Sequence, residues 1–399
     1  MKAESNLQGV MSMKDYIENL PLIDTHMHRI SHLREPDFGQ IAGGVLNGSN
    51  QPYHSRQRIL FGVLVDELRK RFAMPETAAP LAVEEERARR VREDPRAYYK
   101  SCFEGANVAM YCIETGSPLR GKAFLPEEIS FFDSCIPEQC RSYVLRIERF
   151  VDDLLPAELC FEAFEQTLRE RLIEQIRTQR AVALKSAISY YAGLNLQIPA
   201  QADARAAYEK LLGGAHAKAD ERVFYTHTLM LGCEVAAECG IPLQIHTGPG
   251  NSIYFDHKSF NPALLTDFLR DKRVFNRITV VLLHAGHPYE EETGFLVSQY
   301  PNVYTDLSQT FLFSSLMAKE KIRALFEYAP LDKIMYGSDG VLFPEMYWYA
   351  PRRFRELLAD VLVSLKEEHF ISGARAKAVA KAIAYDNALA CYTKLQDML

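Results

Sequence analysis

The sequence lacks a long apolar run, which excludes a membrane-spanning helix as its organising feature. The longest apolar stretches, such as residues 280–283, are far shorter than the ~20 residues that a helical span needs. The first 20 residues carry charged side chains from Lys2 to Glu18 and contain no apolar run, so we expect no secretory signal. A cytoplasmic protein is the default expectation.

The sequence also lacks paired cysteines. Its eight cysteines are scattered without a C-x-x-C pair, so neither a disulfide framework nor a cysteine metal site is indicated. We expect reduced thiols, mostly buried as small core residues.

No strong excess of charge of either sign is present. The 46 Lys and Arg residues against 52 Asp and Glu residues give a formal charge of −6, which argues against nucleic acid or an anionic membrane as partner. No repeat, low-complexity tract or linker divides the chain. With 48% apolar residues, the chain is predicted to form one globular domain over 1–399 that acts on a small molecule. A homo-oligomer is compatible with this composition.

What is present is an alternation of short apolar runs with longer helical patterns. Helix-like segments with apolar residues at spacings of three and four separate eight predicted strands. The predicted strands are Leu22–His28, Asn107–Ile113, Ser142–Glu148, Ala181–Ser186, Pro242–His246, Ile278–His284, Asn302–Asp306 and Lys333–Gly337. This alternation predicts an α/β fold, a (β/α)₈ TIM barrel, with a doubly wound sheet as the alternative.

One large insertion follows the first predicted strand. Residues 30–100 contain charged helical stretches, Arg56–Arg71 and Val83–Arg92. We expect this helical insertion to cap the open end of the barrel.

Polar residues gather where the predicted strands end. The first strand carries Asp24, His26 and His28 on one face, because side chains alternate along a strand. Two imidazoles two residues apart can both reach one metal ion. Two further predicted strands end in His246 and His284.

Asp339 follows the eighth predicted strand, in the loop Gly337-Ser338-Asp339-Gly340. Strand ends of this fold converge on one side of the barrel, where active sites lie, so all these residues are expected to meet. Nitrogen and carboxylate ligands suit a Zn²⁺-like ion with a coordination position left for water.

These motifs resemble those of the amidohydrolase superfamily, in its amidohydrolase-related branch. The resemblance covers roughly residues 20–392. Four segments are also similar to the amidohydrolase part that precedes a glutamine-synthetase-like domain in plant nodulin-type and fungal developmental proteins. These segments are 184–193, 243–248, 302–307 and 338–345. We expect a stand-alone form of that part.

The resemblance implies that His26, His28, His246 and Asp339 are metal ligands. It also implies one or two divalent ions, Zn²⁺ or Mn²⁺. His284 is either a further ligand or an acid/base beside the metal.

Three other residues have alternative interpretations. Lys185 is either a carbamate that bridges two metals or an unmodified residue that anchors a substrate carboxylate or forms a structural salt bridge. Arg29 is a candidate binder of a substrate carboxylate. Glu345 is either a substrate contact or a packing residue.

As a mechanism we expect an activated water to attack a metal-polarised amide carbonyl. Asp339 would carry the proton to the departing nitrogen, and His284 would stabilise the oxyanion. Asp24 could orient an imidazole.

The predicted function is thus metal-dependent hydrolysis of a C–N bond in a small carboxylate-bearing amide, such as a γ-glutamyl amide. The same residues could instead serve a non-oxidative decarboxylase or a uronate-type isomerase. An alternative of another class is a catalytically silent binding or regulatory barrel.

Overall fold

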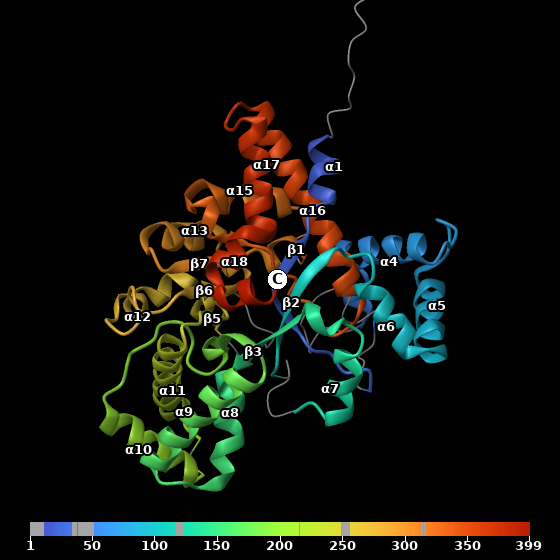
Figure 1. The fold of residues 1–399 in the computed structure, drawn as a ribbon. Coiled ribbons are helices and arrows are strands. Elements are labelled where there is room, and N and C mark those ends of the chain that lie inside the picture. Colours follow the sequence, from blue (N-terminus) through green and yellow to red (C-terminus); the bar gives the residue numbers. More distant parts are fainter. Residues whose placement is uncertain are drawn as a thin grey trace, which may run out of the picture.

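The protein is built around a parallel eight-stranded sheet whose strands follow one another in chain order, from β1 to β8 (Figure 1). The computed structural model describes residues 12–33, 38, 52–116, 123–214, 216–248, 256–312, 314 and 316–399. The strands are β1 Leu22–His28, β2 Val108–Glu114, β3 Arg141–Arg146, β4 Ala181–Ser186, β5 Leu243–Ile245, β6 Val280–Leu282, β7 Val303–Asp306 and β8 Ile334–Met335.

Backbone hydrogen bonds between β1 and the chain after β8 bring the two ends of the sheet together. The amide of Thr25 donates to the carbonyl of Tyr336 at 3.1 Å, and the amide of His28 donates to that of Gly340 at 2.9 Å. A sequential strand order with joined ends is a (β/α)₈ barrel, which confirms the predicted fold and excludes the doubly wound sheet. All seven residues of β1 are buried, as expected for a strand with the barrel interior on one face and helices on the other.

All eight predicted strands exist, but four of them, β3, β5, β6 and β8, end one or two residues earlier than expected. We predicted that β5 would reach His246 and that β6 would reach His284, but they end at Ile245 and Leu282. His284 has a φ of 69°, in the left-handed region, so the extended chain cannot continue through it. Both histidines therefore lie just beyond their strands, on the turns that follow.

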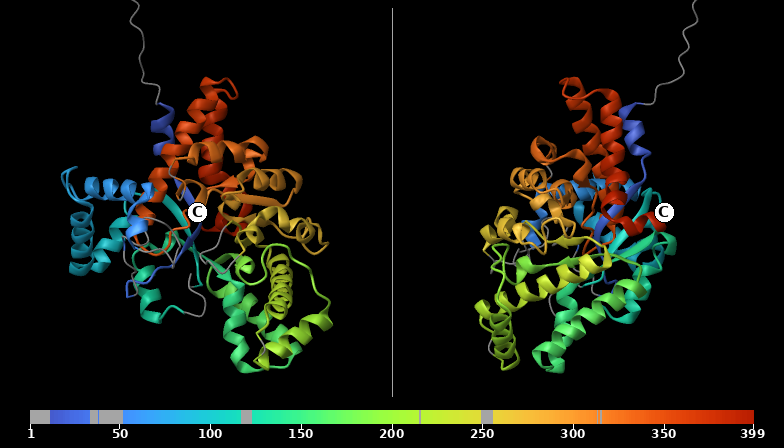
Figure 2. Two further views of the ribbon diagram at one scale, coloured as in Figure 1. Left: turned by 180° about the vertical axis from the view of Figure 1, so that it is seen from behind. Right: turned by 60° about the vertical axis from the view of Figure 1, so that its left-hand side comes forward.

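Helices surround the sheet and form the outer layer of the barrel (Figure 2). They are α1 Met13–Glu18, α3 Pro52–Arg56, α4 Ile59–Arg71, α5 Pro80–Glu93, α6 Pro95–Phe103, α7 Pro126–Asp133, α8 Ile147–Leu154, α9 Phe161–Thr178, α10 Gln201–Leu212, α11 Lys218–Cys239, α12 Thr266–Arg270, α13 Glu290–Gln299, α14 Ser308–Leu312, α15 Ala318–Tyr328, α16 Glu345–Glu367, α17 Gly373–Lys381 and α18 Asn387–Cys391. Among the described residues, no helix combines the length and the apolarity needed to cross a bilayer.

The insertion after β1 is helical, as the sequence predicts. Helices α3 to α6 form a group at one side of the barrel (Figure 1), where α6 packs against α16. Residues 34–37 and 39–51, the first part of the predicted insertion, lie outside the described residues. That the insertion caps the barrel stays a prediction.

Apolar residues of the strands fill the inside of the barrel together with the C-terminal segment. Ile23, Val182 and Met335 belong to this buried cluster, and Tyr392 joins them. The Tyr392 hydroxyl accepts a hydrogen bond from the side chain of Gln244, at 2.9 Å. The first halves of the strands therefore serve packing, while the polar strand ends are free to form a site.

Candidate metal centre

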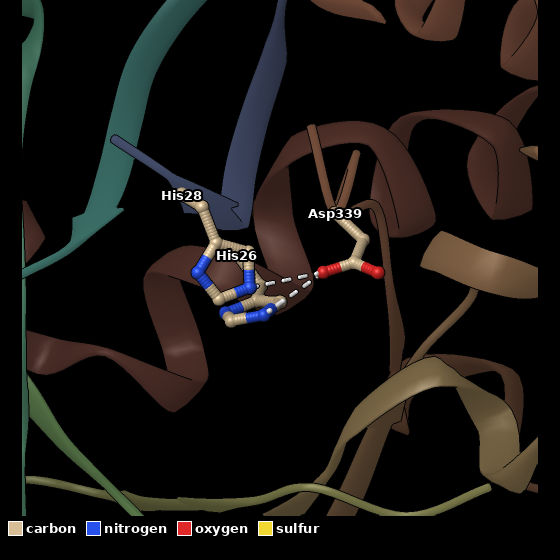
Figure 3. A group of neighbouring side chains, drawn as sticks. All are labelled: His26, His28 and Asp339. Carbon is tan, nitrogen blue, oxygen red and sulfur yellow. Dashed lines mark ion pairs between the residues drawn. The ribbon is translucent and has the colours of Figure 1, made fainter. Parts of the chain in front are cut away.

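Three buried side chains converge where β1 and β8 end. The Nε2 atoms of His26 and His28 each lie 3.3 Å from Oδ1 of Asp339 (Figure 3). The exposed fractions of the three residues are 0%, 7% and 4%, in that order. One atom from each residue can be chosen so that all three atoms lie within 4.8 Å of one another, and this is the one such metal-ligating group among the described residues.

This geometry depends on the backbone that holds Asp339. The amide of Asp339 donates to the carbonyl of His26 at 2.9 Å, so the carboxylate is tied directly to the strand that carries both imidazoles. Asp339 itself has a φ of 46°, in the left-handed region that non-glycine residues rarely adopt. Such strain typically persists where surrounding contacts impose it, and it often marks a functional site.

Asp24 has a different role from the predicted one. We expected it to orient an imidazole, but its Oδ1 accepts the backbone amides of Ser338, at 2.8 Å, and of His26, at 3.3 Å. The pairing of β1 with β2 shifts between Asp24 and Met27, so the strict alternation assumed from the sequence does not hold there. Asp24 therefore organises the backbone at the site.

The carboxylate beside the imidazole of His28, a candidate ligand, belongs to Glu114, which the sequence did not indicate. Its Oε2 lies 2.8 Å from Nδ1 of His28 and forms an ion pair with Arg146. Burial opposes ionisation of Glu114, but Arg146 and His28 hold its pKa well below the usual value. Glu114 and Arg146 end β2 and β3, so charged residues at strand ends were the signal that could have identified them.

The side-chain nitrogen of Lys185 lies within the same buried group. Its Nζ lies 3.0 Å from Nε2 of His26, and the residue is 1% exposed. Burial lowers the pKa of Lys185 to about 8, while Glu114 acts in the opposite direction. The position is compatible with both interpretations of this residue, which stay predictions.

His246 and His284 lie beside the group of three and contact each other. Nδ1 of His246 is 3.1 Å from Nε2 of His284, and its Nε2 is 3.0 Å from the Tyr190 hydroxyl. Nδ1 of His284 is 2.7 Å from Oγ of Ser308. The structure thus brings three of the four expected ligands together, while both nitrogens of His246 have other partners. Burial lowers the pKa of His246, and that of His284 to about 3, so both rings are neutral.

The second oxygen of Asp339 is held by a residue that nothing in the sequence indicated. Nε2 of Gln309 donates to Oδ2 at 2.9 Å, from helix α14. Burial opposes ionisation of Asp339, but His284, His26 and His28 together keep its pKa well below the usual value. Asp339 is therefore an ionised acceptor.

Arg29 and Glu345, two candidate substrate contacts, are engaged in ion pairs instead. Two guanidinium nitrogens of Arg29 donate to the carboxylate of Asp133, at 3.0–3.1 Å. Glu345 pairs with Arg87 of the insertion at 2.5 Å and accepts the Tyr98 hydroxyl. This favours the packing interpretation of Glu345, and neither residue joins the group of three.

The group of three fits a divalent metal ion. Two ligands at about 2.0–2.1 Å from a tetrahedral Zn²⁺ lie roughly 3.3 Å apart, and each Nε2 is 3.3 Å from Oδ1 of Asp339. Two imidazoles and a carboxylate are typical zinc ligands, and three protein ligands leave a position for water or substrate. The residues present therefore suit the ion that the sequence predicts.

Comparison with known proteins shows where this architecture recurs. The chain is 31% identical over 224 residues to Protein fluG of Emericella nidulans, an alignment that covers 53% of this chain and only 25% of that relative. The chain thus spans about a quarter of the length of the curated relative it matches.

Two solved structures share the fold over nearly the whole chain. A provisionally named metal-dependent hydrolase of Lactobacillus casei superposes with a TM-score of 0.79 at 22% identity, over 98% of this chain and 100% of that one. Glucuronate isomerase of Caulobacter crescentus superposes with a TM-score of 0.67 at 14% identity, over 96% and 93% of the two chains.

A protein-family model described as Amidohydrolase matches residues 161–394. The match includes Lys185, His246, His284 and Asp339, whereas His26 and His28 precede it. Because the model covers more than half of the chain, and the barrel carries the expected polar strand ends, this protein belongs to the amidohydrolase family, in its amidohydrolase-related branch.

Proposed function

We propose that the protein is a metal-dependent hydrolase that cleaves the C–N bond of a small, carboxylate-bearing amide. The observation that carries the proposal is the convergence of His26, His28 and Asp339 around one point at the strand ends. These three residues would hold a divalent ion, with Zn²⁺ as the first candidate and Mn²⁺ as the second. When bound, such an ion lowers the pKa of its water to near neutrality, and it also polarises a carbonyl oxygen of the substrate.

Asp339 would move the proton in this reaction. Its Oδ1 faces the two imidazoles, while Oδ2 is held by Gln309. An ionised carboxylate can take a proton from an attacking water and return it to the departing nitrogen, because amide cleavage needs a protonated leaving group. The hydrogen bond from Gln309 keeps the carboxylate in one orientation during this transfer.

Lys185 supports a substrate that carries a negative charge. Its ammonium is buried beside His26, and a buried cation gains most from a partner of opposite charge. A carboxylate of the substrate would supply that partner. The γ-glutamyl amide is one such compound, and its choice rests on the resemblance to proteins fused to a glutamine-synthetase-like domain.

Metal content is the first test. Elemental mass spectrometry of untagged protein is expected to give about one equivalent of Zn or Mn per chain, which a His26→Ala/His28→Ala double variant loses. A His227→Ala variant is the matched control, because that imidazole pairs with Glu165 on the helical layer. Two equivalents would favour the carbamate at Lys185, and no metal after supplementation would favour the silent barrel.

The reaction is then tested with γ-glutamyl and other acyl amides of amino acids. Amine release that Asp339→Asn abolishes, with most of the metal retained, supports the hydrolase. Release of CO₂ from an aromatic or unsaturated acid would make the protein a decarboxylase. Interconversion of a uronate without any release would make it an isomerase, an activity suggested by the fold shared with glucuronate isomerase.

A further inference from the structure

A groove lies on the outer surface of the barrel, between α12, α13 and the end of α15. Its volume is about 860 Å³, and none of its lining residues is a candidate metal ligand. Helices α12 and α13 lie on the side of the barrel opposite the insertion helices α4 and α5 (Figure 1). We call this hollow the outer groove, and the lining residues on which the argument depends are Arg270, Phe275, Glu291, Glu292, Phe295 and Tyr328.

Aromatic side chains are exposed in the outer groove. Phe275 is 42% exposed, Phe295 53% and Tyr328 48%, and the rings of Phe295 and Tyr328 pack edge to face with their centres 6.0 Å apart. The exposed Leu264, next to Ala263 of the lining, extends this apolar surface. Clustered exposed apolar groups mark interaction sites on soluble proteins, and aromatic residues are enriched at the centres of interfaces. The groove therefore has the character of an interface core.

The helices beneath these rings are held close together. A Cβ atom at Gly294 of α13 would lie 2.9 Å from the carbonyl oxygen of Leu325 in α15 and 3.3 Å from Cβ of Tyr328. Glycine at this position thus permits the close approach of α13 and α15. Because Gly294 precedes Phe295, the approach places Phe295 beside Tyr328 before any partner binds. A surface formed in advance loses little conformational freedom on association.

Charges of opposite sign lie towards the two ends of α13. Glu291 and Glu292 are exposed in its first turn. Arg270 is exposed at the end of α12, shortly before Phe275, whose ring packs edge to face on that of Tyr300, just past the end of α13. The rise of 1.5 Å per residue separates Glu291 from Tyr300 by about 14 Å. Within the part of the chain that the structure describes, none of the three charged side chains forms an ion pair.

This pattern of charge is complementary to itself. When two copies face each other about a two-fold axis perpendicular to α13, the two α13 helices run antiparallel. Arg270 of each copy then lies opposite Glu291 and Glu292 of the other copy. Such an interface uses the same surface on both subunits, the commonest arrangement among soluble oligomers. A partner with charges of one sign would instead be attracted at one end of the groove and repelled at the other.

We propose that the outer groove is the interface of a homodimer. The Phe295–Tyr328 pairs of the two copies would form its centre, with an ion-pair site between Arg270 and the two glutamates at each end. Charged residues at the rim of an aromatic centre are the usual anatomy of a specific interface, and they select the orientation of the partner. The inference is independent of the proposed function, because it uses no residue of the metal centre.

Self-association of the full chain is the first test. Sedimentation equilibrium over nanomolar to high micromolar concentrations should show a dimer. Phe295→Ser should raise the dissociation constant of that dimer roughly 30-fold or more, as expected for an aromatic residue at the centre of an interface. Phe370→Ser is the matched control, because Phe370 is also exposed but lies outside the groove, after α16. A wild-type chain that stays monomeric, or a dimer that Phe295→Ser leaves intact, would overturn the proposal.

Reversal of the charges tests the orientation of the two copies. Arg270→Glu alone and Glu291→Lys/Glu292→Lys alone should each weaken the dimer, because each substitution places like charges opposite one another. A mixture of the two variants should form a heterodimer, because the reversed charges attract each other at one end and the unchanged charges do so at the other. Native mass spectrometry with one variant isotopically labelled detects it.

A mixture that stays as dissociated as its two components would contradict the antiparallel arrangement. Circular dichroism and metal content should match wild type in all of these variants, which separates a loss of association from a loss of folding. Because the metal centre is not altered, a failure of the proposed function would appear as missing metal or activity in wild-type protein, whereas a failure of this proposal would appear in the mass of the particle alone.

Discussion

The carboxylate of Asp24 accepts the backbone amide of Ser338 at 2.8 Å, which joins β1 to the residue immediately before Asp339. Two segments more than 300 residues apart in sequence are thereby held in one register. Because β1 carries both imidazoles and Ser338 precedes the carboxylate, this hydrogen bond holds the three candidate metal ligands in place.

Asp24→Ala is therefore expected to weaken Zn²⁺ binding about 10- to 100-fold, the usual cost of losing a group that orients metal ligands. Competition with a chromophoric chelator gives the affinity. Asp24→Asn retains an acceptor oxygen and should lose less. Wild-type affinity in Asp24→Ala would show that the loop holds Asp339 without this contact.

Glu114→Ala should also weaken Zn²⁺ binding, by about 10- to 100-fold, because it removes the carboxylate that lies beside Nδ1 of His28 and pairs with Arg146. The visible spectrum of the Co²⁺-substituted protein should shift as well, since the ligand field changes. Glu127→Gln, at an exposed position in α7, is the control that should match wild type.

The Arg87–Glu345 pair links the insertion to the start of α16, and both residues are buried. Arg87→Met leaves the Glu345 charge buried without its cation and should lower the free energy of unfolding by about 3–5 kcal/mol. The double variant Arg87→Met/Glu345→Leu should recover most of that loss. Denaturant titration measures both, with the exposed Arg89→Met as a control expected to leave the free energy of unfolding nearly unchanged.

The stability of metal-free protein should depend on Asp306 between about pH 4 and pH 6. Burial raises the pKa of Asp306 to about 6 from 3.8, so in this window the folded protein binds a proton that the unfolded chain has released. The contribution of Asp306 to stability is thus fully present at lower pH and is lost as the pH rises through 6. Asp306→Asn should flatten the pH dependence of unfolding in this window, and an unchanged profile would contradict the assigned pKa.

The thiols should react in the order of their exposure. Cys160 is exposed, so a maleimide should label it first in native protein. Cys112 is buried, and burial raises its pKa to about 12, so it should react only after unfolding. Mass spectrometry of peptides after timed labelling gives the order, and early labelling of Cys112 would be incompatible with its place inside the barrel.

The sequence by itself determined the elements and the chemical character of the site. Strands β1 and β4 begin and end as predicted. These features depend on local periodicity, because the side-chain spacing of a helix or strand is a property of a few consecutive residues. The same local rule placed His26 and His28 at the end of β1.

The tertiary structure decided which polar residues touch. The barrel closes between β1 and β8, and this closure brings Asp339 to His26 while it leaves His246 bonded to His284 and Tyr190. His284 and Asp339 both have left-handed backbone conformations, which set the directions of their side chains. The sequence analysis did not predict these conformations. The contacts made by Glu114, Gln309 and Ser308 could likewise not be predicted, because contacts between different strand ends depend on register and barrel closure, which short-range periodicity does not encode.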